Sequence, residues 1–287
     1  MKRRRFLTLT AAALAIPRGA RASSWQGTAL GADVSITLTG RGSQDALAGV
    51  RQTLARIEGL FSLYTPSALT QLNTNGVLPA PPVDFTALCQ IISRVHALTG
   101  GRFDPTVQPL WTALATGTDP RAARALIGWD RVTLSPDRIT LAPGQALTFN
   151  GIAQGFATDI ITAELAAAGF THALINIGEY RALGGPWHIG IDDPAAGQIA
   201  QLALTGQAVA TSSPAAIMAG NTPHILSPSG HPPLWSTASV TAPSAALADA
   251  LSTAFCLMDR AAITQTLARL PGTEARLVDM DGNLSRA

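Results

Sequence analysis

The stretch Asn150-Gly151-Ile152-Ala153-Gln154-Gly155-Phe156-Ala157-Thr158-Asp159 leads the chain out of an extended apolar segment, through a turn with two glycines, and into a helix. Glycine permits a backbone to turn sharply and to approach a ligand closely. The turn exposes backbone N–H groups at the start of a helix, which favours phosphate binding. The stretch is neither Gly-x-Gly-x-x-Gly nor a P-loop with its lysine. Taken alone, it predicts a strand, a turn and a helix, and it leaves phosphate binding open.

Strands and helices are predicted on both sides of this stretch, without a regular alternation of the two. Alternating apolar residues predict a strand at 33–39, and apolar residues at steps of three and four predict a helix around 47–61. Asp84 is expected to cap a helix that reaches residue 98, and Ser244 one that reaches residue 258. This mixture favours an α+β fold in a single compact unit. Further strands are predicted at 132–134, 139–141, 147–149, 173–177, 187–191, 199–204, 208–211, 237–241 and 276–280, and further helices at 155–168 and about 260–269.

The first 22 residues have the features of an export signal. Basic residues at 2–5 precede an apolar run at 6–16, and Ala20-Arg21-Ala22 supplies the small residues of a cleavage site. Adjacent arginines followed by Phe-Leu favour the twin-arginine route, with an ordinary secretory signal as the alternative. The apolar run is shorter than the roughly 20 residues that span a bilayer, so no transmembrane anchor is expected in the mature form. We therefore predict a periplasmic protein that consists of residues 23–287.

Removal of the signal changes the charge of the chain. Six of the 20 basic residues lie within it, which leaves 14 against 18 acidic residues and a net charge of −4. A negative chain lacks the basic surface that holds nucleic acid phosphates, so no nucleic acid partner is expected. Cys89 and Cys256 lie in apolar helical patterns. They are expected to be buried free thiols, although an oxidising periplasm would allow them to pair.

Three further segments carry side chains suited to chemistry. The segment Gly100-Gly101-Arg102-Phe103-Asp104-Pro105-Thr106-Val107 has paired glycines before Asp104, which is expected to cap the next helix. His224 precedes a turn and is either a structural residue or a general base. Asp249 and Thr253 stand at i and i+4 of a predicted helix, so their oxygens share one face. Such a pair either faces water or, completed by backbone carbonyls and phosphate oxygens, binds Mg²⁺.

The order of these segments resembles that of the FAD:protein FMN transferases, the ApbE-like flavin transferases. The resemblance covers nearly all of residues 23–287, and no single motif carries it alone. It implies an ApbE-type, T-fold-like arrangement of mixed helices and antiparallel sheet. The matching motifs are Leu30-Gly31-Ala32, Ser62-Leu63-Tyr64, Ser67-Ala68-Leu69-Thr70-Gln71-Leu72-Asn73, Gly101-Arg102-Phe103-Asp104-Pro105-Thr106-Val107, Gly151-Ile152-Ala153-Gln154-Gly155-Phe156-Ala157, Ile175-Asn176-Ile177-Gly178, Ala210-Thr211-Ser212, His224-Ile225-Leu226 and Asp249-Ala250-Leu251-Ser252-Thr253-Ala254.

The resemblance implies a reaction and a role for each matching residue. FMN would pass from FAD to a Thr or Ser hydroxyl of an exported acceptor flavoprotein subunit, with release of AMP. Mg²⁺ would bridge the FAD pyrophosphate and be held by Asp249, Thr253 and the backbone carbonyl of Gly151. His224 matches the family histidine that takes the proton from the acceptor. Flavin contacts would come from Leu30, Tyr64, Arg102, Phe103, Asp104, Thr148, Gln154 and Ile225.

Several positions depart from the family's pattern. Gln154 stands where many members have Lys or Glu, Thr148 where Asp is common, and Glu179 replaces the second glycine of a Gly-Gly turn. The loop Ser227-Pro228-Ser229-Gly230 is shorter than its family counterpart and lacks an Asp and an Arg. Weaker FAD affinity or slower turnover is therefore expected. Two alternatives stay open: an FAD-binding maturation protein that has lost transfer, and an FAD pyrophosphatase that uses water in place of the hydroxyl.

Overall fold

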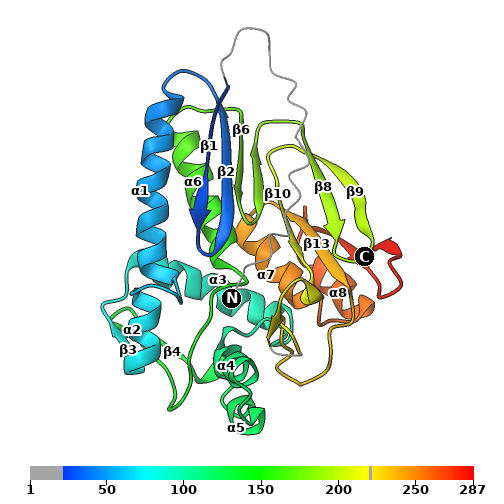
Figure 1. Ribbon diagram of the computed structural model, residues 1–287. Helices are drawn as coiled ribbons and strands as arrows, with labels where there is room; N and C mark the ends of the chain where they lie inside the picture. The colour runs from blue at the N-terminus through cyan, green and yellow to red at the C-terminus, as the bar shows by residue number, and fades with distance from the viewer. Residues whose placement is uncertain (1–21, 220–221) are drawn as a thin grey trace.

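In the computed structural model, which describes residues 22–219 and 222–287, an eight-stranded antiparallel sheet forms the centre of the molecule (Figure 1). Its strand order is β1-β2-β6-β7-β10-β13-β14-β15. The combination of this sheet with helices confirms the α+β prediction. The strands are Ala22–Ala29 (β1), Ala32–Thr39 (β2), Ala173–Ile177 (β6), Tyr180–Leu183 (β7), Ala208–Ser212 (β10), Thr237–Ala242 (β13), Glu274–Val278 (β14) and Leu284–Arg286 (β15).

Helices α1 (Ser43–Phe61), α6 (Ala153–Ala167) and α7 (Ala245–Phe255) pack against this sheet and form the main core with it (Figure 1). α1 begins and ends close to its predicted bounds. α6 contacts β6 and β7, and α7 contacts β10 and β13, so the two helices cover neighbouring parts of the sheet. The residues that predicted α1 are all buried: Leu47, Val50, Leu54, Ile57 and Phe61.

Four phenylalanine rings join the helical layer to the segment that precedes α6. Phe61 of α1 lies with its ring centroid 5.7 Å from Phe149 and 5.8 Å from Phe156. The ring centroid of Phe85 in α3 (Val83–Leu98) lies 5.3 Å from that of Phe149. Edge-to-face contacts at these separations favour one arrangement of the rings. The cluster therefore fixes the position of the chain at residue 149, immediately before the glycine turn.

A two-stranded hairpin of β8 (Trp187–Asp193) and β9 (Gly197–Leu204) is separate from the main sheet. The predicted strands at 187–191 and 199–204 thus pair with each other as an isolated unit. Asp193 anchors the hairpin to β13, because its carboxylate accepts hydrogen bonds of 2.6 Å from Ser236 and Thr237. A second apolar cluster joins the hairpin to β6, β7 and β10 through Leu174, Ala182, Trp187, Ile189, Leu204 and Val209.

Two local predictions are wrong. Residues 147–149 form no strand, because the side-chain amide of Asn73 takes the place of a partner strand. It accepts from the backbone N–H of Leu147 at 2.7 Å and donates to its carbonyl at 2.8 Å. Asp84 does not cap α3 but lies inside its first turn, where it pairs with Arg56. The predicted caps Asp104 and Ser244 do accept backbone N–H groups of the helices that follow them.

The remaining elements are short. Most were not predicted individually, since they have too few residues for a periodic pattern. They are α2 (Ala68–Asn75), β3 (Val77–Pro79), η1 (Pro105–Val107), α4 (Gln108–Thr116), α5 (Pro120–Arg124), η2 (Trp129–Arg131), β4 (Thr133–Leu134), β5 (Arg138–Thr140), η3 (Pro214–Ala216), β11 (Met218–Ala219), β12 (Thr222–Pro223) and α8 (Arg260–Leu267).

The predicted export signal at 1–22 lies outside the described residues, apart from Ala22 at the start of β1. Within residues 22–219 and 222–287, no helix combines the length and the apolar character needed to cross a membrane. Cys89 and Cys256 are both free and buried, as expected.

Candidate functional site

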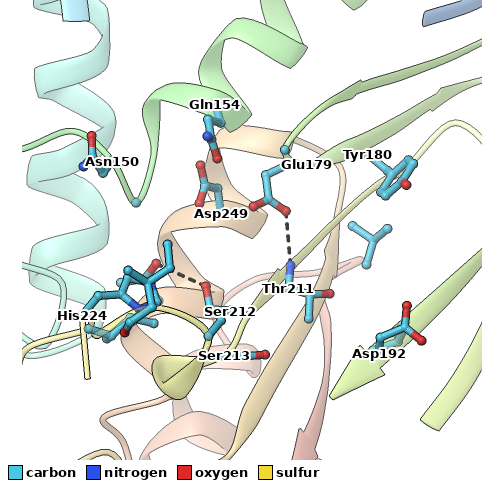
Figure 2. A pocket seen from close by; sticks show the side chains of 18 of the residues that line it. Asn150, Gln154, Glu179, Tyr180, Asp192, Thr211, Ser212, Ser213, His224 and Asp249 are labelled. Carbon is cyan, nitrogen blue, oxygen red and sulfur yellow. Dashed lines mark hydrogen bonds between the residues drawn. The ribbon is translucent and has the colours of Figure 1, made fainter. Parts of the chain in front are cut away.

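A cavity of about 1090 Å³ lies between the glycine turn, α7, β10 and the β8–β9 hairpin (Figure 2). Its volume is slightly above the usual range for small-molecule sites, about 300–1,000 Å³. Eleven of the twelve predicted site residues line it, although they come from segments spread over most of the chain. These are Tyr64, Arg102, Phe103, Asp104, Thr148, Gly151, Gln154, His224, Ile225, Asp249 and Thr253.

Leu30, the twelfth, is not among the residues that line this cavity. It lies in the β1–β2 turn with a positive φ of 49°. Its carbonyl accepts a hydrogen bond of 3.3 Å from the side-chain amide of Gln154, and its N–H donates to Glu58 at 3.0 Å. The structure therefore places Leu30 behind Gln154, where it orients that side chain.

The N-terminal ends of α6 and α7 are held together by two carboxylates that act across the helix pair. Asp159 of α6 accepts from the N–H groups of Ala245 and Ala246 at 2.8 and 3.0 Å. Asp249 of α7 accepts from the N–H of Gly155 at 3.0 Å. Each carboxylate thus binds unpaired N–H groups at the start of the other helix, where the helix dipole favours negative charge. This exchange fixes Asp249 beside the glycine turn.

Thr253 lies one helical turn after Asp249 and directly against Gly151. A Cβ added to Gly151 would lie 3.0 Å from Thr253 Oγ1 and 3.5 Å from the ring of Phe103. Ser212 of β10 places its hydroxyl 3.4 Å from that of Thr253 and 2.7 Å from that of Ser252. The carboxylate, the hydroxyl and the glycine turn therefore meet at one wall of the cavity.

This wall fits a hard divalent cation. Asp249 is 3% exposed, and burial raises the pKa of its carboxyl to about 7. One of its oxygens, Oδ1, receives no hydrogen bond from any described residue. A bound cation would offset the cost of the buried charge. The donors are all oxygens, as Mg²⁺ prefers, and the described residues contain no group of three or more His, Cys, Asp and Glu that would hold another metal.

Glu179 is a second buried carboxylate in the cavity, and it was not among the predicted site residues. It lies between β6 and β7, is 8% exposed, and accepts a hydrogen bond of 3.2 Å from the N–H of Thr211 (Figure 2). Burial, and then the charge of Asp249, hold the pKa of Glu179 well above its usual range. Its only signal in the sequence was the departure from the Gly-Gly turn.

His224 faces the same cavity with a defined tautomer. Its Nδ1 lies 3.0 Å from the carbonyl oxygen of Pro214 and 3.1 Å from that of Ile217. Carbonyl oxygens only accept, so Nδ1 carries the proton and the lone pair of Nε2 is available. Burial lowers the pKa of His224. The ring is therefore neutral near pH 7, as a general base must be.

Arginines from other segments hold the short loop that follows His224. Arg102 donates to the hydroxyl of Ser229 at 2.8 Å, and Arg124 of α5 donates to the carbonyl of Ser227 at 3.1 Å. Arg124 also lies against Gly230, where an added Cβ would be 3.0 Å from its guanidinium. Guanidinium groups thus reach this loop even though its own sequence contains no arginine.

Asp104 organises the other end of the cavity. Its carboxylate accepts from the N–H and hydroxyl of Thr106 at 2.9 and 2.5 Å and from the N–H of Trp129 at 3.1 Å. Phe103 beside it is 5% exposed, whereas Tyr64, which also lines the cavity, is 65% exposed. Lining residues that sequence reasoning did not single out include Asn150, Tyr180, His188, Asp192 and Ser213.

Known structures share the overall fold of this chain. The flavinyl transferase ApbE of Pseudomonas stutzeri, in its apo form, is 26% identical, with a TM-score of 0.79 and 93% of this chain and 94% of that chain covered. The flavin transferase ApbE of Vibrio cholerae is 20% identical, and the apbe protein of Thermotoga maritima is 24% identical. Their TM-scores are 0.81 and 0.83, and each covers 93% of this chain and 97% of its own. The likeness to these last two structures shows the fold.

No curated protein sequence matches the chain significantly. The sequence model of the ApbE family matches residues 30–277, which include all of the motifs that carried the resemblance. The resemblance is therefore confirmed over most of the chain. The chain belongs to the ApbE family.

Proposed function

We propose that this protein transfers FMN from FAD to a Ser or Thr hydroxyl of an exported acceptor protein and releases AMP. The observation that supports this most directly is the meeting of Asp249, Thr253 and Gly151 in a cavity that also contains the free Nε2 of His224. The Pseudomonas stutzeri relative is described as a flavinyl transferase. The proposal extends that activity to this chain.

The diphosphate of FAD would lie against the glycine turn and the start of α6, whose N–H groups favour phosphate. Asp249, Thr253 and the carbonyl of Gly151 would hold Mg²⁺ there, which when bound offsets charge on the leaving phosphate and polarises the attacked phosphorus. Phe103 and Tyr64 supply aromatic surface for the ring systems, and Arg102 supplies a cation at the edge of the cavity.

His224 would act as the general base. The acceptor hydroxyl gives its proton to Nε2, and its oxygen attacks the phosphorus on the FMN side. The bond between the two phosphates then breaks, and AMP leaves with the bridging oxygen. The hydrogen bonds of Nδ1 to two carbonyls keep the ring oriented and stabilise the imidazolium that forms.

Export to the periplasm belongs to the same proposal. It rests on the signal features of residues 1–22. An exported acceptor, such as a flavoprotein subunit, would present its hydroxyl at the open side of the cavity near His224.

The test is incubation of the protein with FAD, Mg²⁺ and candidate exported acceptors. We expect a covalently fluorescent acceptor band and release of AMP. His224→Ala should lower the rate by about 10²–10⁴-fold, the usual contribution of a general base. His231→Ala, which removes an exposed histidine of the same loop region, is the matched control and should retain transfer.

Three other results would contradict the proposal. Release of AMP and FMN without an acceptor would indicate a pyrophosphatase. Bound but intact FAD with every acceptor would indicate a maturation protein without transfer. Equal rates for His224→Ala and the wild type would remove the histidine from the mechanism.

A further inference from the structure

Glu179 is placed by the backbone of two strands rather than by a flexible loop. Its carbonyl accepts from the N–H of Ile177 at 3.2 Å and from the hydroxyl of Thr158 in α6 at 3.5 Å. Its carboxylate receives the N–H of Thr211, the residue before Ser212, whose hydroxyl contacts Thr253. The side chain therefore reaches the same wall of the cavity as Asp249 (Figure 2).

No cation within the described residues balances this pair of carboxylates. The ion pairs formed by those residues include neither Glu179 nor Asp249. Gln154 of α6, a neutral side chain, lies against the turn before Glu179: a Cβ added to Gly178 would be 2.5 Å from its amide oxygen. A buried carboxyl group either keeps its proton or, when ionised, has a charged partner or binds a metal.

Each of the two carboxylates keeps one oxygen available. Glu179 Oε1 and Asp249 Oδ1 receive no hydrogen bond from the described residues. The fully enclosed side-chain atoms that lack a partner are found elsewhere, on Thr39, Arg181 and Thr273. The two free carboxylate oxygens are therefore accessible from the cavity, although both residues are more than nine-tenths buried.

We propose that Glu179 is a second carboxylate ligand of the divalent-cation site formed by Asp249, Thr253 and Gly151, and that the cation binds before FAD. This inference rests on the proposed function, which supplies the cation site and makes FAD the later ligand. Two carboxylates match the charge of a divalent cation, whereas one carboxylate leaves part of it for the diphosphate to balance. Affinity for such a cation rises with the number of charged ligands.

The same charges make FAD binding depend on the cation. Without it, Glu179 and Asp249 bring no positive charge to a diphosphate that is itself negative. With it, the wall of the cavity is close to neutral, and the N–H groups of the glycine turn dominate. FAD should therefore bind weakly to metal-free protein, and removal of one carboxylate should reduce this dependence.

Mn²⁺ binding to the full chain without FAD tests the proposal, with free Mn²⁺ measured by electron paramagnetic resonance. We expect one Mn²⁺ per wild-type chain with a Kd below about 1 mM. Glu179→Gln keeps the shape and removes the charge, and it should weaken Mn²⁺ binding at least tenfold. Asp192→Asn is the matched control, because it removes a carboxylate that lines the same cavity from β8; its Kd should change less than twofold.

The proposal is overturned if Glu179→Gln binds Mn²⁺ as the wild type does, if Asp192→Asn loses as much affinity, or if the wild type binds no Mn²⁺ without FAD. Thermal unfolding in EDTA should show that both variants fold. The measurement contains neither FAD nor an acceptor. Its result can therefore be interpreted even if the protein does not transfer FMN.

Discussion

Gly155→Ala perturbs the contact between α6 and α7 and thereby the position of Asp249. A Cβ at residue 155 would lie 2.3 Å from the carbonyl oxygen of Ala245 and 2.8 Å from the nitrogen of Ala246. Both atoms belong to the backbone of α7, so no side-chain rotation can relieve the overlap. An ordinary contact begins at 3.4 Å, so the helices must separate by about 1 Å.

The expected cost follows from two opposing effects. An extra methyl group in a well-packed interior costs about 1–3 kcal/mol, occasionally more. Replacing glycine by alanine within a helix stabilises the folded state by up to about 1 kcal/mol. Because a rigid backbone must move, we expect the upper part of the range and a net loss of about 2 kcal/mol in the free energy of unfolding.

Separation of the helices also stretches the hydrogen bond from the Gly155 N–H to Asp249, which is 3.0 Å long. Mn²⁺ affinity and FMN transfer should then both fall at least tenfold. Urea unfolding measures the change in the free energy of unfolding, provided that the slope of this free energy against urea concentration is the same for the variant and the wild type. Gly49→Ala is the control, since Gly49 lies within α1 and an added Cβ there meets no atom within 4 Å. It should stabilise the protein by up to about 1 kcal/mol.

Two results would refute this reasoning. If Gly155→Ala is as stable as the wild type, the close approach of α6 and α7 does not constrain the fold. If it is destabilised but retains full Mn²⁺ affinity, the helix contact does not position Asp249.

Three more predictions concern stability and thiol chemistry. The Asp104 carboxylate, 3.6 Å from Nε2 of His96, raises the pKa of His96 above its ordinary 6.5, so the stability from this contact is full below about pH 6.5 and is lost as the pH rises through the folded-state pKa. In urea unfolding, His96→Gln should therefore lose more stability at pH 6 than at pH 9; an equal loss would contradict this. Burial raises the pKa of Cys89 and Cys256 to about 12, so Ellman's reagent should detect two thiols per chain only after unfolding; fewer would mean a disulfide. Asp159→Ala should cost about 3 kcal/mol in urea unfolding, because it removes two N–H contacts of α7 and an ion pair; a loss below 1 kcal/mol would contradict the role of Asp159.

Much of the fold could be predicted because local patterns and tertiary packing agree. Apolar residues at steps of three and four predicted the buried face of α1. The spacing of Asp249 and Thr253 predicted that both side chains lie on one face of α7. Asp104 and Ser244 cap helices because short polar side chains satisfy free N–H groups wherever a helix starts. Each of these inferences needs only a few neighbouring residues.

The wrong predictions depend on partners far along the chain. Residues 147–149 have the composition of a strand, but the side chain of Asn73 satisfies the backbone of Leu147 from 74 residues away, and the N–H of Thr148 donates to the carbonyl of Pro105. The β8–β9 hairpin has ordinary strand sequences, and nothing in them indicates that it leaves the main sheet to form a wall of the cavity.

Two of the departures from the family's pattern lie close together in the folded chain. Gln154 and Glu179 are 25 residues apart in the sequence, where nothing connects the two departures. In the folded chain, Gln154 lies against Gly178, and Glu179 follows it toward Asp249. A lysine at 154 would bring a cation to the turn that carries Glu179, whereas glutamine leaves the carboxylate without one. The two substitutions thus act on the same electrostatic balance, and the proposed divalent cation, held by both carboxylates, would restore it.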